Sequence, residues 1–469
     1  MPNSIPEQII LKRRKKIVEK NGVVLPRTES VEDTLTKIIP LCQKIGVTRV
    51  SDITYMDKLY IPNYTAVLPG TEDSIWVYSG KGVTGAHAQV SALMESIERY
   101  SSLGSTCSKH IIQGTYSQLR KSHGNVLHPD EVVEPVEQAF SYKNSTADFF
   151  KGYDLINNTE VLVPIQLVLS RYSPKSPAVR VFSYSHTNGL ASGNVLEEAV
   201  CHALCEVIER DAASIADLCA SSIPYTILER TMSSFSDIMN YRTIQLINDR
   251  FVDDPSIFPE VDISGVVKEL RPIGSLVKRF INFGIPLLIK EITQHDIGIP
   301  TFVASSSEWL NNEYGLFAKG YGAHPDARVA LLRAITEMSQ TRAGNIQGAR
   351  DDLRRINYAE NDELYKRRWQ FMSTSSPSKI IGKRKVFSEV ESFERYDILD
   401  DIKLILNHLK KAGLNRVLIV DLTHPSIGIP VVRAIVPGLE TFEVAKLFKD
   451  SKLIMGRRAK RGFLRVLRS

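Results

Sequence analysis

The chain contains the stretch Ser91-Ala-Leu-Met-Glu-Ser-Ile-Glu-Arg99 and repeats it, 111 residues later, as His202-Ala-Leu-Cys-Glu-Val-Ile-Glu-Arg210. Each copy follows a glycine-rich loop, Ser79-Gly-Lys-Gly-Val-Thr-Gly85 in the first case and Asn188-Gly-Leu-Ala-Ser-Gly-Asn194 in the second. Self-similarity of this kind indicates an internal duplication. We therefore predict two units of strand, glycine-rich loop and glutamate-bearing helix, near residues 79–100 and 188–210.

Each predicted helix gathers its polar side chains on one face, because positions 0, 4 and 7 of an α-helix point the same way. These positions hold Ser91, Glu95 and Glu98 in the first copy and His202, Glu206 and Glu209 in the second, where Asn194 and Glu198 precede them. Most other positions are apolar, and a helix that is apolar around its girth is typically buried. Buried carboxylates are costly unless arginine, lysine or a metal ion compensates them.

The carboxylates outnumber the cations that the repeats carry. Each copy ends in one arginine, Arg99 or Arg210, and a weaker third copy at Leu332–Gln340 adds Arg333 and Glu337. Hard oxygen ligands suit Mg²⁺, which typically bridges carboxylates to substrate phosphates. The pattern predicts chemistry on a magnesium-bound nucleotide, with a purely structural network of ion pairs as the alternative.

Length and composition exclude several classes of protein. With 469 residues, 43% of them hydrophobic, the chain has material for two or three domains or one large catalytic unit, and it is not a disordered chain. No apolar run approaches the ~20 residues of a transmembrane helix, so no membrane partner is expected. Five cysteines, an odd number, and an N-terminus without the apolar core of a signal peptide favour a cytoplasmic location.

The formal net charge of +6 comes from the two ends of the chain. Five basic residues lie at Lys12–Lys16 and six more in Gly456–Ser469, and without them the body of the protein is about five charges negative. A nucleic-acid-binding protein typically carries a broad basic surface, which this body does not offer. We therefore expect no nucleic acid to bind.

Known nucleotide-binding motifs do not account for the glycine-rich loops. Gly80–Gly85 matches the dinucleotide pattern G-x-G-x-x-G, but the acidic residue that should follow about 20 positions later is missing. The loop also lacks the Gly-Lys-Ser/Thr of a P-loop, and the chain has no protein-kinase signature. The predicted nucleotide site must be of another design.

Five blocks, in order, resemble the YcaO family. They are Gly80-Lys-Gly, Ser91-Ala-Leu-x-Glu95-x-x-Glu98-Arg99, Asn188-Gly-x-x-x-Gly-Asn194-x-x-x-Glu198-Ala, Glu206-x-x-Glu209-Arg210 and Arg333-Ala-x-Thr-Glu337. The resemblance covers roughly residues 20 to 440. It implies a mixed α/β (α+β) fold in which the duplicated units form one ATP site. We divide the chain into an N-terminal region (1–75), a catalytic core (76–440) and a basic C-terminal tail (441–469).

The resemblance also implies which residues form the site. The cofactor-binding residues would be Arg27, Thr34, Ser91, Glu95, Asn194, Glu198, Arg210 and Arg333. The Mg²⁺ ligands would be Glu95, Glu98, Glu198, Glu206 and Glu209, and the catalytic residues Arg210, Arg333 and Glu337. Arg27 stands where some members have lysine, and Thr34 where some have serine. His202 is expected to be an ordinary helical histidine.

Members of the family use ATP and Mg²⁺ to activate a peptide backbone amide by O-phosphorylation. A side-chain nucleophile of the substrate gives an azoline, whereas external sulfide gives a thioamide. Azoline-forming members commonly end in a proline-rich tail, and this chain has no proline after Pro437. We therefore expect thioamidation, with an azoline-forming cyclodehydratase or a non-catalytic scaffold for ATP or peptide as the alternatives.

The basic tail resembles that of the archaeal methanogen members. Their implied target is a glycine in methyl-coenzyme M reductase, which becomes thioglycine. The expected partners are this peptide or protein substrate and a sulfide source, with a TfuA-like helper protein as the candidate donor. A homodimer is the expected assembly, since symmetric dimers are the commonest oligomers.

Overall fold

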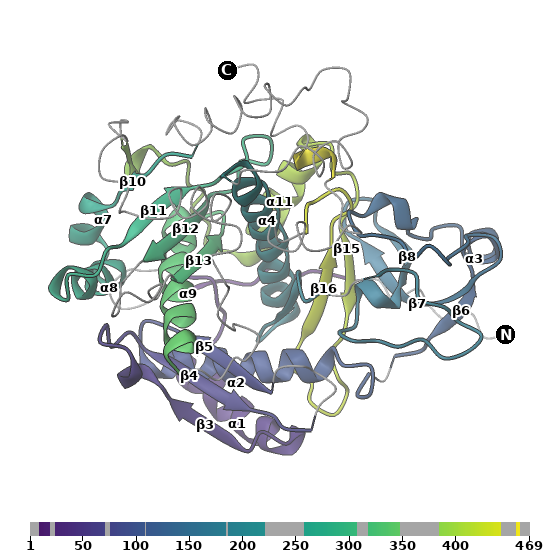
Figure 1. Cartoon of the computed structure of the whole chain (residues 1–469), viewed down its shortest axis with the longest axis horizontal. Helices are drawn as coiled ribbons and strands as arrows, with labels where there is room; N and C mark the ends of the chain where they lie inside the picture. Colours follow the sequence, from purple (N-terminus) through teal and green to yellow (C-terminus); the bar gives the residue numbers. More distant parts are fainter. Residues whose placement is uncertain are drawn as a thin grey trace, which may run out of the picture.

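A computed structural model of the chain describes residues 9–18, 24–70, 76–107, 109–183, 186–220, 258–306, 318–347, 384–441 and 456–459. Most of the predicted basic tail therefore lies outside the described residues. Strands and helices are mixed throughout, as Figure 1 shows, which confirms the predicted α+β class. Three helices, α2 (Gly85–Ser101), α4 (Leu196–Ala220) and α9 (Ala327–Gln347), lie around the centre of the molecule.

The first layer is an antiparallel sheet in the order β3-β4-β5, which is covered by α2, and α1 packs on α2. Its elements are α1 (Val31–Ile45), β3 (Arg49–Asp52), β4 (Asn63–Val67) and β5 (Val77–Lys81). Helix α1 begins where the side chain of Ser30 accepts a hydrogen bond from the N–H of Asp33, and it ends at Gly46 in the left-handed region, with φ 100°. The division at residue 75 falls in the connection between β4 and β5.

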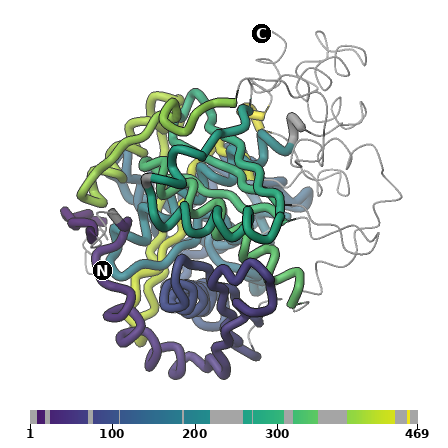
Figure 2. Tube along the Cα trace, turned by 90° about the vertical axis from the view of Figure 1, so that its left-hand side faces the viewer, coloured from purple at the N-terminus to yellow at the C-terminus, as the bar shows by residue number. Residues whose placement is uncertain are grey.

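A second antiparallel sheet, in the order β11-β12-β13, repeats this arrangement. Its elements are α7 (Ser264–Glu269), α8 (Arg271–Asn282), β11 (Leu288–Glu291), β12 (Thr301–Ser306) and β13 (Ala318–Ala323). Helix α9 packs along β13 and β12 as α2 packs along β5 and β4. Figure 2 shows this unit above the N-terminal one. The minor strands β10 (Val261–Asp262) and β14 (Lys385–Val386) pair beside it.

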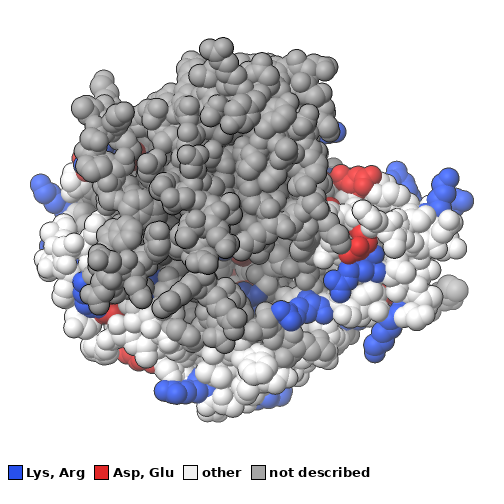
Figure 3. Space-filling view, in the orientation of Figure 1, with Lys and Arg blue, Asp and Glu red and all other residues white. Residues whose placement is uncertain are grey.

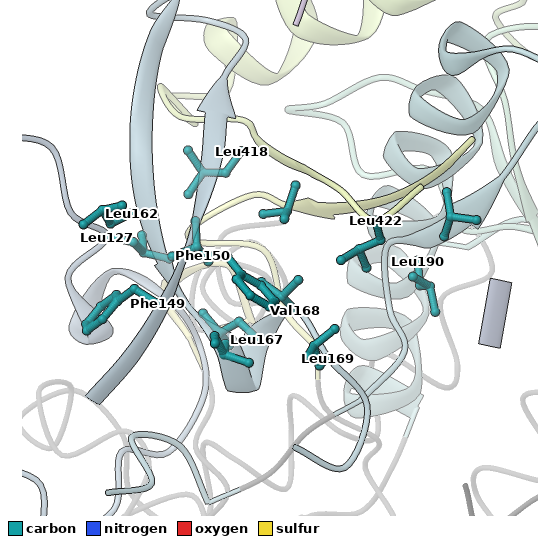
Figure 4. Packing of buried hydrophobic residues seen from close by; sticks show 14 of the residues in the cluster. Leu127, Phe149, Phe150, Leu162, Leu167, Val168, Leu169, Leu190, Leu418 and Leu422 are labelled. Atoms are coloured by element: carbon teal, nitrogen blue, oxygen red, sulfur yellow. The ribbon is translucent and has the colours of Figure 1, made fainter. Parts of the chain in front are cut away.

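The third sheet is the largest, in the order β6-β7-β15-β16-β9, with β8 paired to β7. Helix α4 packs on β16 and β9, and α11 packs on α4. The elements are β6 (Ile112–Thr115), α3 (Tyr116–His123), β7 (Thr146–Asp154), β8 (Thr159–Pro164), β9 (Leu190–Ser192), α11 (Ile398–Lys411), β15 (Leu418–Asp421) and β16 (Val431–Ile435). Aromatic and leucine side chains of β7, β8 and β15, among them Phe149, Leu162 and Leu418, fill its core (Figure 4).

Three units of strand, short loop and helix therefore surround the centre. Strand β5 leads into α2 and β9 leads into α4, as the duplicated sequence predicts, and β13 leads into α9. The third unit contains the degenerate copy at 332–340. In the first and third units a glycine allows the helix to lie directly on its strand. A Cβ on Gly80 would lie 2.1 Å from the carbonyl oxygen of Ala88, and a Cβ on Gly322 would lie 2.1 Å from that of Ala330.

The N-terminal basic cluster binds the acidic faces of α4 and α11. The Lys16 ammonium lies 2.5 Å from the Asp401 carboxylate, and both side chains are almost completely buried. Arg14 forms an ion pair with Glu197 at 3.1 Å, and the N–H of Lys12 donates to the same carboxylate. The charge of the cluster is thus partly neutralised inside the molecule. On the face shown in Figure 3, the basic side chains of the described residues are scattered.

Replacing Lys16 by methionine should lower the free energy of unfolding by about 3–5 kcal/mol, because the Asp401 charge would stay buried without its partner. Lys15→Met is the matched control, since Lys15 is exposed, and should change stability by less than about 0.5 kcal/mol. Urea unfolding of both variants measures the difference. Equal effects of the two substitutions would contradict a buried ion pair.

Candidate active site

One large cavity, about 630 Å³ in volume, lies between α2, α4 and α9. All the site residues proposed from the sequence line it. They are Arg27, Thr34, Ser91, Glu95, Glu98, Asn194, Glu198, Glu206, Glu209, Arg210, Arg333 and Glu337. A cavity of this size is typical of small-molecule sites. The structure brings these residues together, whereas the role of each one stays a prediction.

Three helices turn their carboxylates towards this cavity. Glu95 and Glu98 come from α2, Glu206 and Glu209 from α4, and Glu337 from α9. Among the described residues, seven glutamates and five lysines or arginines line the cavity. Carboxyl groups therefore outnumber basic groups in the wall. A nucleoside triphosphate brings further negative charge, so divalent cations favour its binding there.

Crowding and burial perturb these carboxylates. Burial raises the pKa of Glu98 well above its usual value, and Glu206 and Glu95 raise it further, against the opposing effect of Arg99. Burial likewise raises the pKa of Glu206, although Arg210 and Arg433 lower it. Neighbouring carboxylates that disfavour each other's ionisation form a good site for a cation.

Glu209 and Glu337 lie in the same wall but differ in their partners. Burial and the neighbouring Glu337 raise the pKa of Glu209 to about 7, and its carboxylate accepts a hydrogen bond from the N–H of Ala323 at 3.2 Å. For Glu337, burial raises the pKa, but the Lys81 ammonium 2.5 Å away and Arg210 lower it to about 2. Glu337 is therefore ionised at neutral pH.

Glu198 holds the N-terminal segment against the second glycine-rich loop. One carboxylate oxygen accepts from the N–H and the hydroxyl of Thr28, at 2.6 and 2.7 Å. The other accepts from the N–H of Asn194 at 3.0 Å and from its side-chain amide at 3.4 Å. Thr34 also donates to Asn194, at 3.2 Å. Thr28 lies between Arg27 and Thr34, two predicted site residues, but no role of its own was predicted for it from the sequence.

Two arginines of the cavity, Arg210 and Arg333, have few close partners among the described residues. The Arg210 guanidinium lies 3.8 Å from Glu206, one helical turn earlier, and the Nε of Arg333 has no hydrogen-bond partner among the described residues. Burial, together with Arg333 and Arg27, lowers the pKa of His202 well below its usual value, so this histidine is neutral. Arg210 and Arg333 thus keep hydrogen-bond donors that an anionic ligand could use.

A short segment of the C-terminal tail packs against α4 at Asp211, in the interior of the helix. The Arg458 guanidinium binds Asp211, at 2.9 Å, and Asp296, at 2.5 Å. Asp211 directly follows Arg210 in the chain. Glu440 accepts hydrogen bonds from the N–H groups of Gly456 and Ala459, both at 2.9 Å. The described part of the tail therefore lies close to the carboxylate cavity.

A buried set of carboxylates from three helices, with arginines and a lysine between them, is typical of enzymes that bind a nucleotide through divalent cations. The donor set fits Mg²⁺, because its ligands are hard carboxylate oxygens. Comparison with known protein families identifies the family of enzymes to which this site belongs. The family described as YcaO cyclodehydratase, ATP- and Mg²⁺-binding, matches residues 79–440. The chain belongs to the YcaO family, and its cofactors are ATP and Mg²⁺.

Related sequences cover nearly the whole chain. An uncharacterised protein of Methanothermobacter thermautotrophicus is 31% identical over 426 residues, which are 89% of this chain and 96% of that protein. A protein encoded in the tfuA 3′ region of Rhizobium leguminosarum bv. trifolii is 28% identical, over 88% of each chain.

Solved structures share the fold. A heterocyclase in complex with substrate and cofactor superposes with a TM-score of 0.70 at 21% identity, over 98% of this chain and 57% of that one. YcaO from Methanopyrus kandleri, bound with AMPPCP and Mg²⁺, superposes with a TM-score of 0.64 at 22% identity, over 92% and 95% of the two chains. These similarities confirm the predicted YcaO-type fold.

Among the described residues, no helix is long and apolar enough to cross a membrane.

The affinity for Mg²⁺ should rise as the pH increases from about 6 to 8, because Glu209, with a pKa raised to about 7, must lose its proton to bind a cation. Without Mg²⁺, the free energy of unfolding should instead fall as the pH rises. The folded state keeps a proton on Glu209 that the unfolded state releases, so this stabilisation is complete below the unfolded pKa of about 4.5 and is lost as the pH rises to about 7.

Melting temperatures between about pH 5 and 8, with and without Mg²⁺ and ATP, test both trends. The Glu209→Gln variant isolates this residue, because Asp401 and Glu440 also have raised pKa values, about 6 and about 7. If wild type and Glu209→Gln show the same pH dependence, Glu209 does not titrate in this range.

Proposed function

We propose that this chain converts a backbone amide of a peptide or protein substrate into a thioamide, with ATP as co-substrate and external sulfide as the sulfur source. The carboxylate cavity with Arg210 and Arg333 carries the ATP-dependent part of this proposal. The sulfur-dependent part is supported by a relative that is encoded in a tfuA region. A TfuA-like helper is therefore the sulfide donor we propose.

The proposed target is a glycine of methyl-coenzyme M reductase, which the resemblance to methanogen members implies. A relative from Methanothermobacter thermautotrophicus and the similar fold of the Methanopyrus kandleri protein support this choice. Such a target places the reaction in the cytoplasm.

The reaction balances with one equivalent of each reactant. Hydrosulfide adds to the amide carbon, and the resulting oxyanion takes the γ-phosphoryl group of ATP. The C–O bond then breaks and hydrogen phosphate leaves with the former carbonyl oxygen and the proton of hydrosulfide. The products are the thioamide, ADP and phosphate. Phosphorylation is needed because an oxide ion is too poor a leaving group.

In this proposal Arg210 and Arg333 bind the phosphate oxygens and stabilise the charge that develops on the transferred phosphoryl group. Lys81 lies next to the same wall and is held by Glu337 at 2.5 Å. Because Glu337 is ionised at neutral pH, it does not donate a proton; it orients Lys81, and Lys81 contacts the nucleotide.

Glu95, Glu98, Glu206 and Glu209 are the proposed Mg²⁺ ligands. When bound, Mg²⁺ would neutralise phosphate oxygens and polarise the transferred group. Glu198 remains on this list from the sequence. Its oxygens already accept four hydrogen bonds from Thr28 and Asn194, so ligation by Glu198 requires at least one of these to open.

An azoline-forming cyclodehydratase is the second candidate, because the family description names cyclodehydratases and a heterocyclase shares the fold. The two candidates differ only in where the nucleophile comes from. A purely non-catalytic scaffold is the least favoured alternative, since the cavity keeps every carboxylate that the family motifs contain.

Mass spectrometry of the product distinguishes these functions. A substrate peptide containing the target glycine is incubated with enzyme, ATP, Mg²⁺ and sodium hydrosulfide, with and without the helper protein. Exchange of oxygen for sulfur is the expected result. Loss of one water indicates azoline formation instead, and ATP consumption without any change of the peptide mass with the helper present would overturn both.

Glu206→Gln should reduce product formation at least about 100-fold, because a neutral amide is a poor Mg²⁺ ligand in a cavity that depends on charge. Glu32→Gln is the matched control, since Glu32 is exposed on α1, and should keep wild-type turnover. Circular dichroism verifies that both variants fold. Wild-type turnover by Glu206→Gln would refute the assignment of Glu206 to the metal site.

A further inference from the structure

The three units of strand, loop and helix can be aligned position by position. The 111-residue repeat pairs Glu98 of α2 with Glu209 of α4. The weaker third copy pairs Glu95 with Glu337, and this places Gln340 of α9 at the position of Glu98. Two units therefore carry a carboxylate at this helix position, whereas the third carries an uncharged amide.

The same alignment equates Lys81 on β5 with Ser192 on β9 and with Ala323 at the end of β13. In two of these strands the backbone N–H binds the helix carboxylate of another unit. Ser192 donates to Glu98, and Ala323 donates to Glu209 at 3.2 Å. Lys81 differs, because its N–H has no acceptor in the part of the chain that the structure describes.

The backbone of β5 alternates between its neighbour β4 and the open edge of the sheet. The carbonyl oxygen of Trp76 and the N–H of Gly82 are bonded to residues that flank β4, so the even-numbered residues of β5 face β4. Val77, Ser79 and Lys81 therefore direct their N–H and C=O groups away from β4. These three residues also line the carboxylate cavity.

Gln340 reaches this edge but leaves most of it open. Its side-chain amide donates to the carbonyl oxygen of Ser79, and Gln340 itself lines the cavity. Among the described residues, none accepts a hydrogen bond from the N–H of Ser79 or of Lys81. Backbone donors without a partner beside a cavity are a template for an added strand. A carboxylate closes the edge in the other two units, whereas the amide leaves the edge of β5 available.

The wall beside this edge changes from charged to neutral along α9. Glu337 forms the ion pair with Lys81 at 2.5 Å, and the next residues on the same helix face that line the cavity are Gln340, Thr341 and Gly344. A Cβ on Gly344 would meet no described atom within 4 Å, so this part of the cavity has room. Mg²⁺ is typically bound through carboxylates. Neutral hydrogen-bonding groups beside an open strand edge suit a peptide backbone instead.

We propose that the substrate peptide binds in an extended conformation along the open edge of β5, as an added strand between β5 and the last turns of α9. This inference rests on the proposed function, because its ligand is the peptide of that reaction. The N–H groups of Ser79 and Lys81 donate to two carbonyl oxygens of the peptide. The Lys81 ammonium, which Glu337 holds at 2.5 Å, contacts the nucleotide, so the amide bound at Lys81 lies next to the γ-phosphoryl group.

An N-methyl scan of the peptide tests the strand pairing on the wild-type protein. The backbone groups of an added strand face β5 at every second residue only. The probe is a labelled peptide of about ten residues, centred on the target glycine, and its Kd is measured by fluorescence anisotropy with AMPPCP and Mg²⁺ present. N-methylation at one parity should raise the Kd at least about tenfold, and at the other parity less than about threefold. Equal effects at the two parities, or no binding of the unmethylated peptide, would overturn the inference.

Gly344→Leu tests the same site from the side of α9. Gly344 lies one helical turn after Gln340, and the leucine side chain would fill the neutral part of the cavity. We expect the KM for the peptide to rise at least about tenfold, while the KM for ATP changes less than about twofold. Gly265→Leu is the matched control, because Gly265 is exposed on α7, has equal room for a Cβ among the described residues and does not line the cavity. It should change both KM values less than about twofold.

The results separate this inference from the proposed function. Thioamide formation by Gly344→Leu with an unchanged KM for the peptide overturns the strand-edge site and leaves thioamidation intact. Loss of water from the peptide in place of sulfur exchange overturns thioamidation, and the KM of Gly344→Leu still decides the strand-edge site. If the wild-type enzyme changes no peptide, the proposed function fails and this inference fails with it.

Discussion

The burial of several glutamates around one cavity is the constraint on which the rest of this structure depends. Each carboxylate loses hydration when its helix packs, and the protein compensates this loss only in part. Lys81 compensates Glu337, and Thr28 and Asn194 compensate Glu198. Glu98, Glu206 and Glu209 keep raised pKa values in spite of nearby arginines. These three carboxylates are the least compensated, which is why we propose that Mg²⁺ binds in their part of the cavity.

The fold meets this constraint by bringing three helices together on strands that allow close contact. At Gly80 and Gly322 the backbone of the following helix lies so near the strand that any side chain would collide with it. The apolar faces of the helices then pack on the sheets, and their carboxylate faces meet at the centre. The same short unit, used three times, thus supplies both the packing and the charged cavity.

Much of the site could be predicted from the sequence, because helical periodicity places Glu95 with Glu98 and Glu206 with Glu209 whatever the tertiary structure. The repeat showed that these two faces belong together. The third unit was only weakly visible, since Arg333 and Glu337 keep the polar positions while the Glu-Arg ending is lost. Thr28 could not be singled out, because one half-buried residue in a loop forms no pattern and its partner Glu198 is far away in the sequence.

The basic residues at the two chain ends pair with buried or half-buried carboxylates of the protein itself. Lys16 and Arg14 are bound to carboxylates of α11 and α4, and Arg458 is bound to Asp211, so these three basic residues act as counter-charges within the protein. Arg458 and Glu440 fix the residue that follows Arg210, and Thr441 holds the carboxylate that binds His186. The segment that follows β16 therefore contacts α4 at Asp211 through Glu440, and it contacts the His186–Glu134 pair through Thr441. Because Asp211 is the next residue after Arg210 on α4, the contacts of Glu440 and Arg458 fix the helix at the position where Arg210 lines the carboxylate cavity.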